Sequence, residues 1–143
     1  MRRNLFAGLL LILAPMAAQD LPSQVREMKR QGDYAGAKAL LEREAQQGGP
    51  SALRALAEFL DLHKDPGTRV AYEKLAAALP TGGEERRQAL RRLVVLDLIA
   101  GDQAAAARHL EQYRAAGGSG VTLPAAQPPQ VARETISIPG PLH

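Results

Sequence analysis

The chain has 143 residues, among them 18 Lys and Arg, 15 Asp and Glu, and no cysteine. The absence of cysteine excludes disulfides, thiol catalysis and a lipid anchor attached to an N-terminal cysteine. Two Phe, three Tyr and no Trp accompany a formal net charge of +3, so the chain lacks the stacking aromatics and basic surface typical of nucleic-acid-binding proteins.

Residues 1–18 have the pattern of a secretory signal peptide. Arg2 and Arg3 precede an apolar run over residues 5–14, and small residues follow as far as Ala18. We expect cleavage near Ala18–Gln19 and export to the bacterial periplasm or the extracellular space. The alternative is an uncleaved membrane anchor, but a bilayer core needs about 20 apolar residues and this run is shorter. Removal of both arginines leaves 16 basic and 15 acidic residues, and we expect no transmembrane helix in the mature chain.

Apolar residues recur at helical spacing along residues 20–116, and helix breakers separate the runs. This pattern predicts an all-α domain over residues 19–116, with six helices in three antiparallel hairpins. Asp33 and Asp102 are expected to cap the second and sixth helices, and Asp65 is expected to start the fourth helix with Pro66 at its first position. Thr81 and Glu84 have the spacing of a capping box before the fifth helix.

One small pattern repeats along these hairpins. Ala37, Ala71 and Ala106 lie 34 and 35 residues apart, and a leucine follows each alanine by four residues. A period of this length in helix-forming sequence is typical of stacked helical hairpins, in which each unit buries its apolar face against its neighbours.

These residues resemble the tetratricopeptide repeat family over residues 20–116. The matching residues are Gly32, Tyr34, Ala37 and Leu41 in the first unit, Leu56, Ala57, Ala71, Leu75 and Pro80 in the second, and Leu93, Gly101, Ala106 and Leu110 in the third. The family's bulky aromatic near the start of each unit is missing, and Asp65–Pro66 stands where a turn glycine would be expected. The resemblance implies a right-handed solenoid whose concave groove, lined mainly by the first helix of each hairpin, holds a peptide or protein. It implies no catalysis.

The resemblance also implies which residues line the groove. They are Arg26, Lys29, Arg30, Arg54, Glu58, Arg91 and Val95. The cationic members favour an acidic peptide or a carboxylate as the partner. The alternative is that these side chains form ordinary solvated faces of amphipathic helices.

The sequence contains no recognisable catalytic, cofactor or metal motif. The serines lie at expected caps, in loops or in the tail, and His63, His109 and His143 lack the spacing of a metal site. We therefore expect no enzyme, no cofactor and no metal.

The last part of the chain changes composition. Residues 117–130 have the Gly and Pro content of a flexible linker. Residues 131–143 are expected to form an extended tail, in which Ile136 and Ile138 alternate with Thr135 and Ser137 as in a β-strand. Such a strand would add to a partner's sheet, or else the chain is the front of a longer protein. The sixth helix ends directly at glycine, so Leu110 and Tyr113 have no obvious cover.

Together these features predict a non-catalytic protein interaction scaffold of the bacterial cell envelope. The first alternative is a recruiting or regulatory N-terminal arm of a larger exported protein or enzyme. A peripheral membrane protein is disfavoured, because no helix of the mature chain combines a strongly basic face with aromatic anchors.

Overall fold

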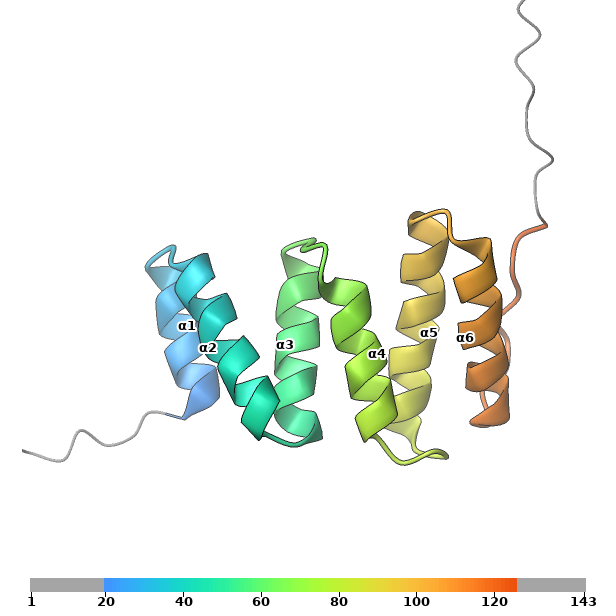
Figure 1. Cartoon of the computed structure of the whole chain (residues 1–143), viewed down its shortest axis with the longest axis horizontal. Coiled ribbons are helices and arrows are strands. Elements are labelled where there is room, and N and C mark those ends of the chain that lie inside the picture. Colours follow the sequence, from blue (N-terminus) through green and yellow to red (C-terminus); the bar gives the residue numbers. More distant parts are fainter. Residues whose placement is uncertain (1–19, 126–143) are drawn as a thin grey trace, which may run out of the picture.

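The computed structural model describes residues 20–125, which contain six α-helices and no strand (Figure 1). The helices are α1 (Leu21–Arg30), α2 (Tyr34–Gln47), α3 (Pro50–Leu62), α4 (Thr68–Ala78), α5 (Glu84–Ile99) and α6 (Gln103–Ala115). The all-α class and the six expected helices are confirmed. The expected signal peptide and the tail beyond residue 130 lie outside the described residues. None of the helices in residues 20–125 has the length and apolar character needed to span a bilayer.

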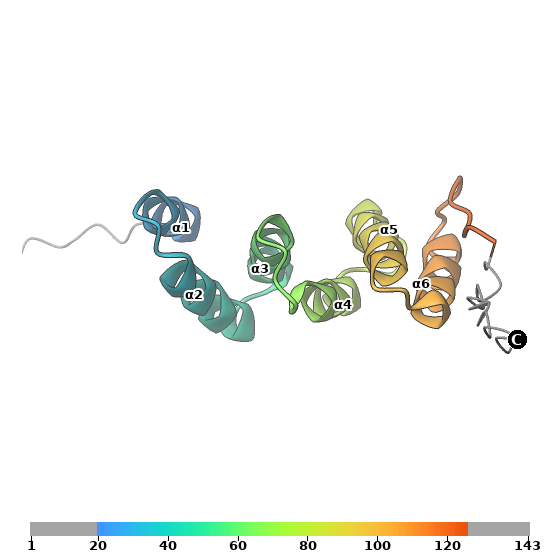
Figure 2. The ribbon, with the colours of Figure 1, turned by 90° about the horizontal axis from the view of Figure 1, so that it is seen from above.

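The helices form two rows. Each helix packs against the helices before and after it in the chain, and no other two helices in residues 20–125 bring Cα atoms within 8 Å. Figure 2 shows α1, α3 and α5 in one row and α2, α4 and α6 in the other. We call these the odd face and the even face. Grooves lie between α1 and α3, between α3 and α5, and between α2 and α4, and in each of them a helix of the other row supplies part of the lining.

The turn within each hairpin has the same backbone structure. An aspartate N–H donates to the backbone carbonyl five residues earlier: Asp33 to Met28, Asp65 to Leu60 and Asp102 to Asp97. The residue before each aspartate has a positive φ: Gly32, Lys64 and Gly101. This is the Schellman arrangement that ends many helices. Lys64 therefore takes the place of the turn glycine that the second hairpin lacks.

Two of the expected helix caps form and two do not. Asp33 accepts a hydrogen bond from the Gly36 N–H at 2.8 Å, and Asp102 accepts one from the Ala105 N–H at 2.9 Å. The fourth helix was expected to start at Asp65–Pro66, but α4 begins at Thr68 after Gly67, because Asp65 belongs to the preceding turn.

The expected capping box before the fifth helix is also wrong. Gly83 occupies the N-cap position of α5 and makes no side-chain cap bond, while Thr81 lies further back in the turn. The Glu84 carboxylate accepts from Arg87 Nε at 3.0 Å and from Gln88 at 3.3 Å, so it is occupied by partners one helical turn ahead.

The small residues of the repeat lie in the buried core. Ala37, Ala71 and Ala106 are buried, as are the leucines that follow them, Leu41, Leu75 and Leu110. Small side chains at these positions allow close packing without voids. Helix α1 differs from the others because it has no buried residue, and its apolar side chains Leu21, Val25 and Met28 are only partly buried against the core.

The chain folds back after α6. Gly117 has a φ of 88°, and the Gly118 N–H donates to the Tyr113 carbonyl at 2.9 Å. Val121 and Leu123 then pack against the core. The expectation that Leu110 and Tyr113 would lack a cover was therefore wrong, since both are buried. Of the expected linker, residues 126–130 lie outside the described range.

Candidate functional site

Ion pairs join α3 and α5 across their groove on the odd face. Arg92 of α5 donates to both carboxylate oxygens of Asp61, from Nε at 2.7 Å and from Nη2 at 2.6 Å. Tyr72 of α4 donates to Asp61 Oδ2 at 3.3 Å, and Arg54 of α3 pairs with Glu85 of α5. The hydrogen bonds from Arg92 lower the pKa of Asp61, while burial, together with the Asp61 charge, raises the pKa of Tyr72 to about 12. Polar side chains therefore hold this groove together.

The other groove on the odd face, between α1 and α3, is open. It encloses about 390 Å³, and no ion pair crosses it among the described residues. Its apolar lining residues are Leu21, Pro22, Val25, Leu41, Ala55, Phe59 and Leu62. Arg26 and Lys29 of α1 and Glu58 of α3 supply its charged groups. An apolar cleft with a few charged groups at its edge is the usual form of a binding site.

The structure brings three of the seven expected groove residues together. Arg26, Lys29 and Glu58 line the α1/α3 groove. Arg30 does not line it, and its guanidinium pairs with Glu27 at 2.7 Å within α1.

The remaining expected groove residues lie elsewhere on the odd face. Arg54 lines the α3/α5 groove, where Glu85 already neutralises it, and Glu58 reaches this groove as well. Arg91 lines a hollow of about 200 Å³ beside Tyr113 and the turn after α6. Val95 is partly exposed on α5 and lines none of these hollows.

The hairpin turns show which groove positions are equivalent. Arg26, Glu58 and Val95 each lie seven residues before the turn aspartate of their hairpin. Three residues before it lie Arg30, Leu62 and Ile99. The side chains of Leu62 and Ile99 are 65% and 75% exposed, and sequence reasoning missed both. Counting back from the turn aspartates would have found them. At these two positions the odd face therefore changes from cationic on α1 to apolar on α5.

On the even face, a buried polar cluster joins α4, α5 and α6. Asp97 of α5 is 0% exposed, and its Oδ2 lies 2.6 Å from Nδ1 of His109. Arg69 Nη2 lies 2.6 Å from Asp97 Oδ1 and 3.1 Å from Asp102 Oδ2. The Arg69–Asp97 contact is an ion pair without hydrogen-bond alignment, since Oδ1 accepts no aligned N–H. Sequence reasoning missed Asp97, because it lies within an apolar helical stretch.

The second even-face groove, between α2 and α4, contains a hollow of about 450 Å³ over α3. At one end of this hollow Lys38 of α2 pairs with Asp65, which lies in the turn before α4.

The described residues contain no group of three or more His, Asp or Glu placed to hold a metal. His63 contacts two aromatic rings, with centroid distances of 4.8 Å to Tyr34 and 4.6 Å to Phe59. Comparison with protein families, curated proteins and solved structures gave no match to this chain. The resemblance to tetratricopeptide repeats therefore stays a hypothesis, and the grooves are the basis for assigning a function.

Proposed function

We propose that the chain is a non-catalytic interaction scaffold of the bacterial cell envelope, built as a tetratricopeptide-like right-handed solenoid. Its partner is a protein segment with apolar and acidic side chains, held in the groove between α1 and α3. The observation that supports this most directly is the contrast between the two odd-face grooves. One is apolar and open, whereas the other is crossed by Arg92–Asp61 and Arg54–Glu85.

The lining of the α1/α3 groove favours a segment of this composition. Burial of apolar side chains against Val25 and Phe59 supplies a non-directional attraction. Arg26 and Lys29 attract carboxylates at the α1 side, and Glu58 disfavours an acidic group at the α3 side. An amphipathic helix with apolar residues at i, i+3 or i+4 and i+7, and an acidic flank, has this arrangement.

Site-specific crosslinking tests the assignment. A photoreactive side chain at position 62, exposed at the edge of the groove, is expected to capture the partner in the native host, and mass spectrometry identifies it. The segment of the partner that binds is then purified. It should bind the double variant Arg26→Glu, Lys29→Glu at least about tenfold more weakly than the parent chain, because each charge reversal replaces attraction by repulsion. Arg43→Glu is the matched control, since Arg43 lies on α2 outside this groove. Equal affinity of the double variant at matched folding would exclude the groove as the site.

Export is part of the same proposal and rests on residues 1–18. The intact mass of the native product tests it. A mass that begins at Gln19 supports cleavage and export, whereas a product that retains Met1 contradicts cleavage. A mass well above that of Gln19–His143 would favour the recruiting arm of a larger protein.

A further inference from the structure

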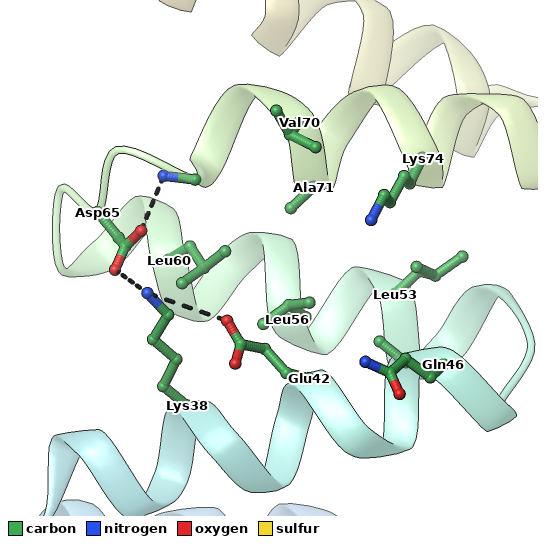
Figure 3. A pocket seen from close by; sticks show the side chains of 12 residues that line it. Lys38, Glu42, Gln46, Leu53, Leu56, Leu60, Asp65, Val70, Ala71 and Lys74 are labelled. Carbon is green, nitrogen blue, oxygen red and sulfur yellow. Dashed lines mark hydrogen bonds and ion pairs between the residues drawn. The ribbon is translucent and has the colours of Figure 1, made fainter.

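The α2/α4 hollow on the even face has an apolar floor and charged groups at its two ends (Figure 3). Leu53, Leu56 and Leu60 come from α3, and Val70 and Ala71 come from α4. Its volume, about 450 Å³, lies in the range of about 300–1,000 Å³ found for small-molecule sites. The hollow shares no lining residue with the α1/α3 groove.

One end of the hollow is neutralised internally. Lys38 Nζ lies 2.7 Å from Asp65 Oδ2 and 3.9 Å from Glu42 Oε1. Asp65 also accepts from the Gly67 N–H at 2.8 Å. The hydrogen bond from Lys38 lowers the pKa of Asp65, and the same bond raises the pKa of Lys38. Two carboxylates share one ammonium here, so this end has no spare positive charge for a ligand.

The other end carries an unneutralised cation. Figure 3 shows the ammonium of Lys74 pointing from α4 into the hollow, with the Gln46 amide on α2. Among the described residues, Lys74 makes no ion pair. A positive charge and an amide therefore lie beside an apolar floor at this end.

We propose that this hollow binds a medium-chain aliphatic carboxylate. The carboxylate pairs with Lys74 and accepts from the Gln46 amide, and the alkyl chain runs over Leu56 and Leu60 toward the Lys38–Asp65 pair. The lining on the α4 side extends from Gly67, the N-cap of this helix, to Lys74. This is about 10 Å at 1.5 Å per residue, which suits a medium-length acyl chain.

The lining favours an acyl chain over a peptide. The floor and one wall are helices α3 and α4, whose backbone groups are hydrogen-bonded within the helices, and the Gly67 N–H is already bound to Asp65. An extended peptide would bury amide groups here without partners, at a cost in free energy. An alkyl chain has no polar group to satisfy, apart from the carboxylate at its end.

Binding is measured by methyl NMR titration of the full chain with octanoate, below its micelle concentration, and with 1-octanol. We expect octanoate to shift the methyl signals of Leu56, Leu60 and Val70. Lys74→Ala should weaken octanoate about fivefold, as expected for one partly exposed charge pair, and leave 1-octanol unchanged. Val70→Asp should abolish binding of both, because Val70 is exposed at the hollow and the variant places a charge on its apolar lining.

Two controls separate this proposal from the odd-face groove. Val95→Asp, at an exposed valine on α5, and Lys29→Ala should leave octanoate binding unchanged. The proposal is overturned if Lys74→Ala binds octanoate as the parent does, or if the shifted methyls are those of Val25 and Leu62. Tighter binding of a short peptide ending in leucine than of octanoate would overturn the acyl assignment.

Discussion

Asp97 of α5 and His109 of α6 meet inside the packed helices, with Oδ2 and Nδ1 2.6 Å apart. Asp97 is also paired with Arg69 of α4, so a single carboxylate joins three helices from two hairpins. Replacing Asp97 with Ala leaves Arg69 and His109 without this partner. We expect a loss of about 3 kcal/mol in the free energy of unfolding, the scale seen when one member of a buried pair is removed.

Urea denaturation measures this loss. Glu73→Ala, at an exposed position of α4, is the control and should change the free energy of unfolding by less than about 0.5 kcal/mol. A cost for Asp97→Ala as small as that of the control would mean that the cluster contributes little to stability.

Tyr72 makes the free energy of unfolding depend on pH in the alkaline range. Its pKa is about 12 in the folded chain, whereas an unperturbed tyrosine has a pKa of about 10. Between these values the unfolded chain has lost the proton and the folded chain retains it, so the free energy of unfolding falls as pH rises. We expect the parent to lose more stability than Tyr72→Phe from pH 10 to 12. Urea unfolding at each pH measures this loss. If the free energy of unfolding fell equally with pH in the parent and in Tyr72→Phe, the raised pKa would be contradicted.

Asp61 gives the free energy of unfolding a pH dependence of the opposite sign, in the acid range. Arg92 lowers the pKa of Asp61 in the folded chain. Its contribution to stability is therefore present above the unfolded pKa, about 3.9, and is lost as pH falls through the folded pKa. Asp61→Asn should be less stable than the parent at pH 7, and the difference should shrink in acid. A difference that stays constant between pH 6 and pH 2 would show that the ionisation of Asp61 does not matter.

The backbone is strained at Lys64, and a glycine at this position should relieve the strain. Lys64 has a φ of 53°, a conformation that costs a non-glycine residue about 1 kcal/mol. Lys64→Gly should therefore raise the free energy of unfolding by about that amount. Gly101→Ala places alanine at the equivalent position, where nothing lies within 4 Å of the new Cβ, and should lower it similarly. Changes of the same sign in both variants would contradict the equivalence of the two turns.

Helix α1 should open before the others. It has no buried residue, and it packs only against α2, so few contacts oppose local unfolding. Amide hydrogen exchange is expected to be faster in α1 than in α5. Binding of a partner in the α1/α3 groove should slow exchange in α1 selectively, while slowing confined to α5 would place the partner elsewhere.

Local signals in the sequence predicted all six helices, although the expected start of α4 was wrong. Ala37 and Leu41 recur at helical and repeat spacing, and their burial follows from that pattern. The turn at Lys64 escaped prediction because a lysine with positive φ depends on the backbone bond from Asp65 to Leu60, which composition does not reveal. The burial of Tyr113 was not predicted, because the Gly-rich sequence after α6 does not show that the chain folds back over this helix.

The site could be predicted only in part. Arg26 and Glu58 follow from their place on the first helix of each hairpin. The pairing of Arg54 with Glu85 links residues of different hairpins, and its effect on the α3/α5 groove depends on side-chain packing across that groove. The α2/α4 hollow was not predicted at all, since the residues of its floor look like ordinary core.

Each helix packs only against its chain neighbours, and this has a consequence for how the chain acquires its structure. Short-range contacts form quickly, because little chain entropy is lost when they close. The first hairpin, residues 21–47, needs nothing from α5 or α6 to make its own contacts. When the chain is made N-terminus first, contacts between consecutive helices can therefore form before its last residues are available.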